Sequence, residues 1–151
     1  MKPILQALLL CDRVYVDVSG KFIIVGVFDR WLYKLPKPAA PGNEVVEPGS
    51  EVKKTINEIQ DVGTPWAFIS ITDVKGPTKL ELRFEQLTGS EVFFSAGIEV
   101  SSEDPLSSVK IGIPVPKLPS KAGDYILELL HEDVSLGSHR VRIEEFVDAT
   151  N

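Results

Sequence analysis

Polar and apolar residues alternate along several stretches of this chain. In the clearest stretch, 78–87, Leu80, Leu82 and Phe84 alternate with charged neighbours. A period of two is typical of a strand with one face in a core and the other in water. The same alternation recurs at Val14/Val16/Val18, Ile98/Val100, Val109/Ile111/Ile113 and Val141/Ile143. The pattern therefore predicts a protein built mainly of half-buried strands.

Residues 22–28 depart from this alternation because they are apolar without interruption, in the order Phe-Ile-Ile-Val-Gly-Val-Phe. Such a run suits a strand that is covered on both faces. We therefore predict that this segment is a central strand and forms the spine of its sheet.

Turn-forming residues separate the predicted strands and suit hairpin connections. The expected turns are Ser19-Gly20, Thr88-Gly89-Ser90 and the segment from Val134 to Gly137. Strands joined by hairpins, with few helices, are typical of an antiparallel sandwich.

Gly123-Asp124-Tyr125 opens a further predicted strand over 125–130. A Tyr at this place resembles the tyrosine corner of immunoglobulin-like sandwiches, in which the hydroxyl bonds a nearby backbone group. Together these patterns predict an all-β fold. We expect one antiparallel, immunoglobulin-like β-sandwich domain over 1–151, with about seven or eight strands.

One segment interrupts the strand pattern. Five of the 11 prolines and three of the 11 glycines lie within residues 36–65. A connection of this length in a compact domain is usually functional, disordered or contains an element of its own. Val52, Ile56 and Ile59 have helical spacing, so we predict a long loop with a short helix over about 51–61.

The chain has 151 residues, with 16 Lys and Arg against 22 Asp and Glu, which gives a net charge of −6. An acidic chain without a basic cluster lacks the charge pattern that supplies most affinity for nucleic acid. No stretch approaches the ~20 apolar residues that a bilayer-spanning helix needs. We therefore expect neither nucleic acid nor a membrane as partner.

Cys11 is the single cysteine, so no intrachain disulfide can form and nothing indicates an oxidising compartment. Residues 4–11 resemble the apolar core of a signal peptide, but Gln6 breaks the stretch and Asp12 follows it directly. We interpret this segment as a buried first strand, with Cys11 as a small buried hydrophobe. We predict a cytoplasmic protein.

Glycine spacing argues against two kinds of nucleotide site. A dinucleotide fingerprint needs glycines two and three positions apart, and a phosphate-binding P-loop needs them five apart. The tightest pair in this chain, Gly20 and Gly26, is six positions apart. The G-x-S-x-G sequence of many hydrolases is also missing. We therefore expect no cofactor.

Two histidines are the chain's only imidazole ligands for a metal. If the last hairpin is centred on Ser135, His131 and His139 face each other across it, with Glu132 beside them. Two nitrogens and a carboxylate could hold a metal ion, as in a metal- or small-ligand-dependent enzyme. The alternative, which we favour, is that the two histidines flank an exposed turn.

Four aspartates near predicted strand ends are the other candidates for such an enzyme: Asp12, Asp17, Asp29 and Asp73. Their spacing matches no calcium-binding loop. Strand-end Asp side chains commonly bond the backbone of their own turn, and we favour this structural role.

Three aromatic residues are the candidates for a binding surface. Trp31 and Tyr33 are two positions apart, so both rings project from one face of an extended segment, and Trp66 follows the long loop. Flat rings offer large contact area at small entropic cost, as in platforms that hold sugars or peptides. The alternative, which we favour, is that the rings close one end of the core.

Two parts of the chain carry a resemblance. They are Leu10-Cys11-Asp12-Arg13-Val14 with residues 19–29, and Ala122-Gly123-Asp124-Tyr125 with Leu136-Gly137. Together they are similar to a family of small uncharacterised bacterial β-sandwich proteins, a domain of unknown function. The resemblance implies a cytoplasmic single-domain sandwich in which residues 37–64 are an insertion, and it assigns no catalytic residue.

These observations favour a non-catalytic β-sandwich that binds another protein through the 36–65 loop. Binding residues concentrate on loops that a rigid scaffold carries. The rival interpretation is the enzyme that uses His131 and His139 or the strand-end aspartates. Self-association through an exposed strand edge is a third.

Overall fold

The computed structural model describes residues 2–34, 65–89 and 91–147, which contain nine β-strands and no helix. The strands are β1 (Ile4–Val16), β2 (Phe22–Val27), β3 (Arg30–Tyr33), β4 (Trp66–Thr72), β5 (Thr78–Gln86), β6 (Val92–Val100), β7 (Val109–Pro114), β8 (Gly123–His131) and β9 (Val134–Glu145). Nothing in these ranges is a helix that could cross a membrane. The predicted helix over 51–61, and the 36–65 loop apart from Pro65, lie outside the described residues.

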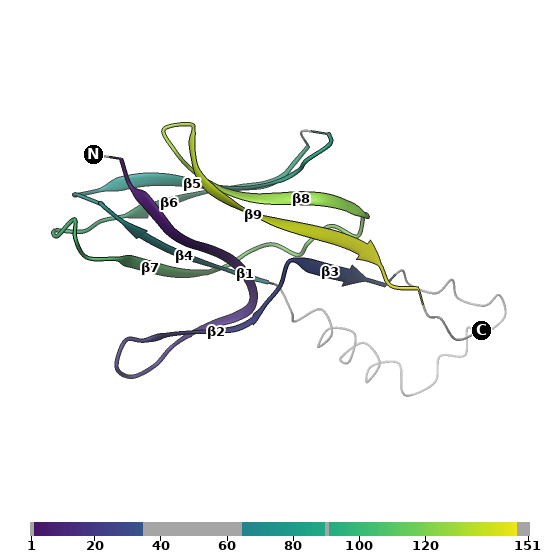
Figure 1. The fold of residues 1–151 in the computed structure, drawn as a ribbon, viewed down its shortest axis with the longest axis horizontal. Helices are drawn as coiled ribbons and strands as arrows, with labels where there is room; N and C mark the ends of the chain where they lie inside the picture. Colours follow the sequence, from purple (N-terminus) through teal and green to yellow (C-terminus); the bar gives the residue numbers. More distant parts are fainter. Residues whose placement is uncertain (1, 35–64, 90, 148–151) are drawn as a thin grey trace, which may run out of the picture.

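The strands form two sheets that pack against each other (Figure 1), which confirms the all-β, two-sheet prediction. One sheet has the order β2-β1-β4-β7 and the other has the order β3-β9-β8-β5-β6. Among these paired strands every neighbour is antiparallel except β3, which runs parallel to β9. The described residues contain nine strands where seven or eight are expected, and the consecutive strands β2 and β3 lie in different sheets.

Alternating side chains from the two sheets meet in the main core. Leu80, Leu82 and Phe84 of β5 are at most 3% exposed, as their period of two predicts. Across the sandwich they share one cluster with Leu10 of β1 and Ile69 of β4. The predicted pattern of core and water faces is therefore confirmed for β5.

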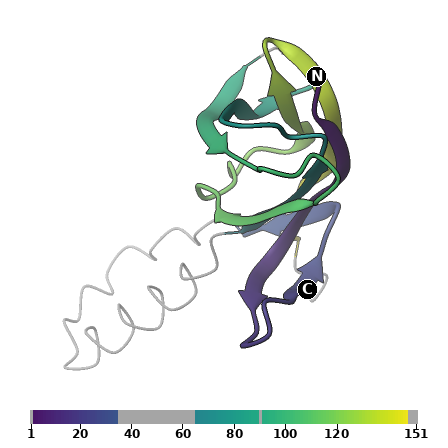
Figure 2. The same ribbon diagram turned by 90° about the vertical axis from the view of Figure 1, so that its left-hand side faces the viewer.

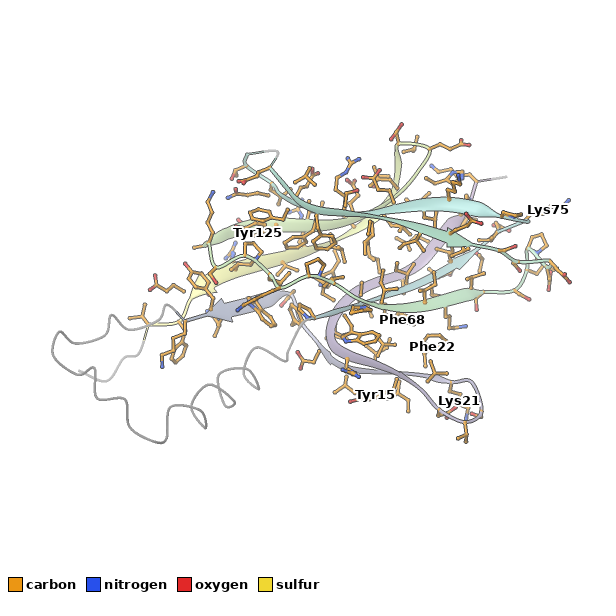
Figure 3. The ribbon with its side chains drawn as sticks, turned by 180° about the vertical axis from the view of Figure 1, so that it is seen from behind. Tyr15, Lys21, Phe22, Phe68, Lys75 and Tyr125 are labelled. Carbon is orange, nitrogen blue, oxygen red and sulfur yellow. The ribbon has the colours of Figure 1, made fainter. Side chains whose placement is uncertain are left out.

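Tyr125 of β8 is fully buried in this core (Figure 3). Its ring stacks on Phe84 with 5.4 Å between centroids. Its hydroxyl donates a 2.8 Å hydrogen bond to the carbonyl oxygen of Lys121, four residues upstream. This is the local bond that the sequence predicts for Tyr125.

The uninterrupted apolar run over 22–28 is not the central strand, so that prediction is wrong. β2 lies at the edge of its sheet, and Ile23 and Val25 are 48% and 45% exposed. Gly26 has a φ of +68°, and a Cβ there would collide with the carboxylate of Asp12. The chain can therefore bend at this glycine, out of the first sheet and on towards β3. The strand that is covered on both faces is β4, in which five of seven residues are buried.

The end of β1 and all of β2 form a hairpin that projects from the sandwich body (Figures 1 and 2). Its inner side packs on the outer face of the first sheet, where the ring of Phe22 lies 5.7 Å from that of Phe68 (Figure 3). Val14 joins this second cluster and is buried as predicted. Val16 and Val18, which the alternation also predicts to be buried, are instead exposed near the hairpin tip.

Candidate functional site

The aromatic candidates lie in two different clusters. Trp31 and Tyr33 are half-buried, alternate with exposed neighbours along β3 and pack against the main core. Trp31 also contacts the ring of Phe28, with 5.1 Å between centroids. Trp66 begins β4 in the other sheet and packs in the second cluster. The structure therefore does not bring the three rings together, and Trp31 and Tyr33 lie where core-closing rings would lie.

The last hairpin does not turn where the sequence predicts. Its turn consists of Glu132 and Asp133, with φ values of 50° and 61°, so the turn predicted over 134–137 is wrong. Two left-handed residues form the tight turn whose twist matches that of the flanking strands. His131 consequently pairs with Val134, and not with His139.

His139 lies opposite Leu127, four residues from His131 along β8. At ~3.3 Å per residue this separates the two histidines by roughly 13 Å along the strand. The Nε2 atom of His139 donates to the carbonyl oxygen of Phe28 at 2.8 Å, since a carbonyl can only accept. His131 and Glu132 line a hollow of about 340 Å³ together with Lys2.

The two histidines therefore lack the facing arrangement on which the metal-site prediction rests. In the part of the chain that the structure describes, no three His, Cys, Asp or Glu side chains group so that they could hold a metal ion.

The strand-end aspartates are also dispersed. Asp17 accepts hydrogen bonds within its own turn from Ser19 Oγ at 2.7 Å, Ser19 N at 2.8 Å and Lys21 N at 2.9 Å. The bonds from Ser19 and Lys21 hold the pKa of the Asp17 carboxyl below its ordinary value. The carboxylate of Asp12 lies against Gly26. Asp73, at a φ of 59°, donates its backbone N–H to Pro105.

Cys11 is fully buried in the second cluster, which confirms its predicted packing role. Its thiol donates to the carbonyl oxygen of Trp66 at 3.4 Å. Burial raises the pKa of this thiol, so the reactive thiolate is disfavoured.

A hollow of about 590 Å³ lies over one end of the second sheet and is lined by charged side chains. Arg30 donates to Glu144 at 2.7 Å, and Arg142 donates to Asp124 at 3.0 Å. These arginines already have carboxylate partners, and exposed pairs of this kind stabilise a fold only weakly. The hollow therefore has the character of a network of surface ion pairs.

The outward side of the β1–β2 hairpin has a different character. Arg13 lies opposite Val25, and Tyr15 lies opposite Ile23, in the antiparallel register of β1 and β2. Directly opposed residues share one face of a sheet. We call these four residues, Arg13, Tyr15, Ile23 and Val25, the hairpin face. All four are exposed, so three large apolar side chains share this face with one cation.

Arg13 is held in place by two aromatic rings. Its guanidinium carbon lies 4.9 Å from the ring centroid of Trp66 and 5.6 Å from that of Tyr15. Cation–π contacts of this length orient an arginine without using its N–H donors. Among the described residues, this guanidinium takes part in no ion pair and no hydrogen bond.

The sequence pattern did not predict the hairpin face, because the uninterrupted apolar run over 22–28 indicated a covered central strand. The sequence signal that could have found it is the Ser19-Gly20 turn, which gives the apolar run one hairpin neighbour and indicates no second one. Trp66 was identified as a candidate, although its contact with Arg13 was not.

A scan against protein-family models finds no match to this chain, and a search of curated proteins finds none either.

Proposed function

We propose that this protein is a non-catalytic binding module whose partner is another protein, engaged through the hairpin face. The observation that carries the proposal is the group of exposed Tyr15, Ile23 and Val25 on the same face as Arg13, which contacts two aromatic rings. Contiguous apolar side chains on a surface mark sites where another molecule docks. Tyr, Trp and Arg are also the residues that contribute most to binding at protein interfaces.

The packed side chains beneath the hairpin face favour binding of a partner without rearrangement of the hairpin. Phe22 and Ile24, on the inner side of β2, pack in the second cluster with Val14 and Phe68. Side chains fixed before association lose little further freedom when a partner docks. A rigid apolar surface of this kind suits a protein partner.

We also propose that the sandwich is immunoglobulin-like. The parallel pairing of β3 with the C-terminal strand β9 supports this, as does the antiparallel series β9-β8-β5-β6 beside it. The hydrogen bond from Tyr125 to Lys121 supports it as well. We propose in addition that the protein is cytoplasmic and is related to the bacterial sandwich family that its sequence resembles. The single cysteine is compatible with both proposals.

Affinity capture followed by mass spectrometry tests the binding function. The bait is the full chain, compared with an Ile23→Thr/Val25→Thr variant that keeps β-branched residues in β2 but removes apolar surface. We expect the variant to recover its specific partner at least about tenfold less well, as for residues at the centre of an interface. Val134→Thr is the matched control, since Val134 is 51% exposed at the far hairpin.

A further bait lacking residues 38–62 tests the loop that the sequence nominates. If the loop deletion loses the partner and the Ile23→Thr/Val25→Thr variant keeps it, the hairpin face is not the binding surface. If both baits keep every partner, neither segment has the proposed role.

A further inference from the structure

We infer that the hairpin face binds an apolar protein segment that carries a carboxylate, which pairs with Arg13. This inference rests on the proposed function and names the chemistry of its partner. It follows from three features of the site: a guanidinium without a carboxylate partner among the described residues, its contact with two rings and its apolar surroundings.

The guanidinium of Arg13 is the first feature. Arginine carries five N–H donors in a rigid planar fork, and that fork matches the two oxygens of a carboxylate. Within the described ranges, Arg13 and Arg140 have no such partner, whereas Arg30, Arg83 and Arg142 each pair with a carboxylate. In a chain with a net charge of −6, an arginine without a carboxylate partner is a site where an acidic group can still bind.

The contact with two rings is the second feature. The rings of Trp66 and Tyr15 contact the guanidinium within 6 Å of their centroids. Neither contact is a hydrogen bond to an oxygen or an ion pair, so the N–H donors of Arg13 have no acceptor among the described residues and can bind an incoming one. A cation that is already positioned loses less freedom on binding than a free surface lysine or arginine does.

The apolar surroundings come third, and they distinguish among anionic partners. Val25 lies directly opposite Arg13, and Ile23 lies opposite the neighbouring Tyr15, so a partner that covers both also removes water from around Arg13. A charge pair gains strength as water leaves. A phosphate backbone would leave these apolar side chains uncovered, whereas an apolar peptide with an Asp or Glu satisfies both features.

Selection from a phage-displayed library of random dodecapeptides tests the inference with the full chain as target. Peptides that bind wild-type protein but not the Ile23→Thr/Val25→Thr variant are sequenced, synthesised and measured by fluorescence polarisation. We expect these peptides to be enriched in Asp or Glu flanked by apolar residues. Arg13→Gln should weaken their binding about tenfold, as the loss of a charge-assisted bidentate pair would.

A double-mutant cycle separates direct pairing from indirect effects. Replacing the peptide's acidic residue by its amide should weaken binding to wild-type protein about as much as Arg13→Gln does. The same replacement should not further weaken binding to the Arg13→Gln protein. Arg140→Gln, an exposed arginine on the other sheet, is the matched control and should bind as wild type does. Near-ultraviolet circular dichroism verifies that each variant is folded.

Two outcomes would overturn the inference, and only the second would also count against the proposed function. Hairpin-dependent peptides without acidic enrichment, or equal affinity for Arg13→Gln, would refute the carboxylate partner and leave the hairpin face as an apolar docking surface. A selection that yields no hairpin-dependent peptide would count against the proposed function itself, and the inference would fail with it.

Discussion

Tyr125 shows at the scale of one residue how a side chain combines burial with a single polar bond. The ring is fully buried and the hydroxyl bonds Lys121 O at 2.8 Å. Replacing Tyr125 by Phe keeps the ring and leaves that carbonyl without its partner. We expect a loss of about 1 kcal/mol in the free energy of unfolding, measured by urea denaturation. Tyr15→Phe is the control, and a similar loss there would contradict a specific role for the Tyr125 bond.

Asp17 links one turn to the pH dependence of stability. Hydrogen bonds from Ser19 and Lys21 lower the pKa of its carboxyl below the ordinary 3.8 in the folded protein. The resulting stabilisation is complete above that ordinary value and is lost as the pH falls below it, through the lowered pKa. Asp17→Asn should therefore lose less stability than wild type between about pH 5 and pH 2.

Thermal unfolding across this pH range measures the effect of Asp17→Asn. Glu103→Gln is the matched control, since it removes one exposed carboxylate outside this turn. If Asp17→Asn and wild type lose stability in parallel, the turn carboxylate does not contribute in this way.

At the scale of elements, the β8–β9 hairpin shows how a turn sets the register of two strands. Glu132 and Asp133 both have positive φ, a conformation that Asn and Gly adopt at lower cost. Replacing them by Asn-Gly should stabilise the protein by about 1 kcal/mol and raise the Tm by about 3 °C. A differential scanning calorimetry trace with an unchanged or lower Tm would contradict the assigned turn.

The same hairpin explains why a metal site could not be judged from spacing alone. Its turn comprises Glu132 and Asp133 and not residues around Ser135, and this shift moves His139 opposite Leu127. In a ladder, a small change in turn position alters every cross-strand pair. Sequence distance between the two histidines was therefore a poor guide to their separation.

At the scale of the whole molecule, Gly112 lets the hairpin close onto the sandwich. A Cβ at this position would lie 2.6 Å from a Val14 methyl carbon, across the outer face of the sheet. Gly112→Ala should therefore push the hairpin away and lower the free energy of unfolding by about 1–3 kcal/mol, the usual effect of overpacking.

Gly97 of strand β6 provides the matched comparison because a Cβ at this position would meet nothing within 4 Å. Gly97→Ala should be neutral or slightly stabilising, since alanine restricts the unfolded chain more than glycine does. Chemical denaturation compares the two variants. Equal stabilities would mean that the hairpin tolerates displacement from the sheet.

Local patterns in the chain predicted much of this molecule. Period-two alternation identified β5 and its core face, and the Gly-Asp-Tyr segment anticipated the bond of Tyr125. A lone cysteine in an apolar stretch predicted a buried thiol. These features depend on neighbours a few residues apart, and local chemistry is sufficient to specify them.

The position of each strand in its sheet was decided by tertiary structure. Both β2 and β4 are apolar segments of one sheet, but β2 lies at its edge and β4 lies inside it. Periodicity does not distinguish an edge strand from a covered one. The bend at Gly26 and the close approach of Val14 to Gly112 resolve the choice through long-range packing. The contacts of Arg13 with the rings of Tyr15 and Trp66 arise in the same way, because these two rings lie more than 50 positions apart in sequence.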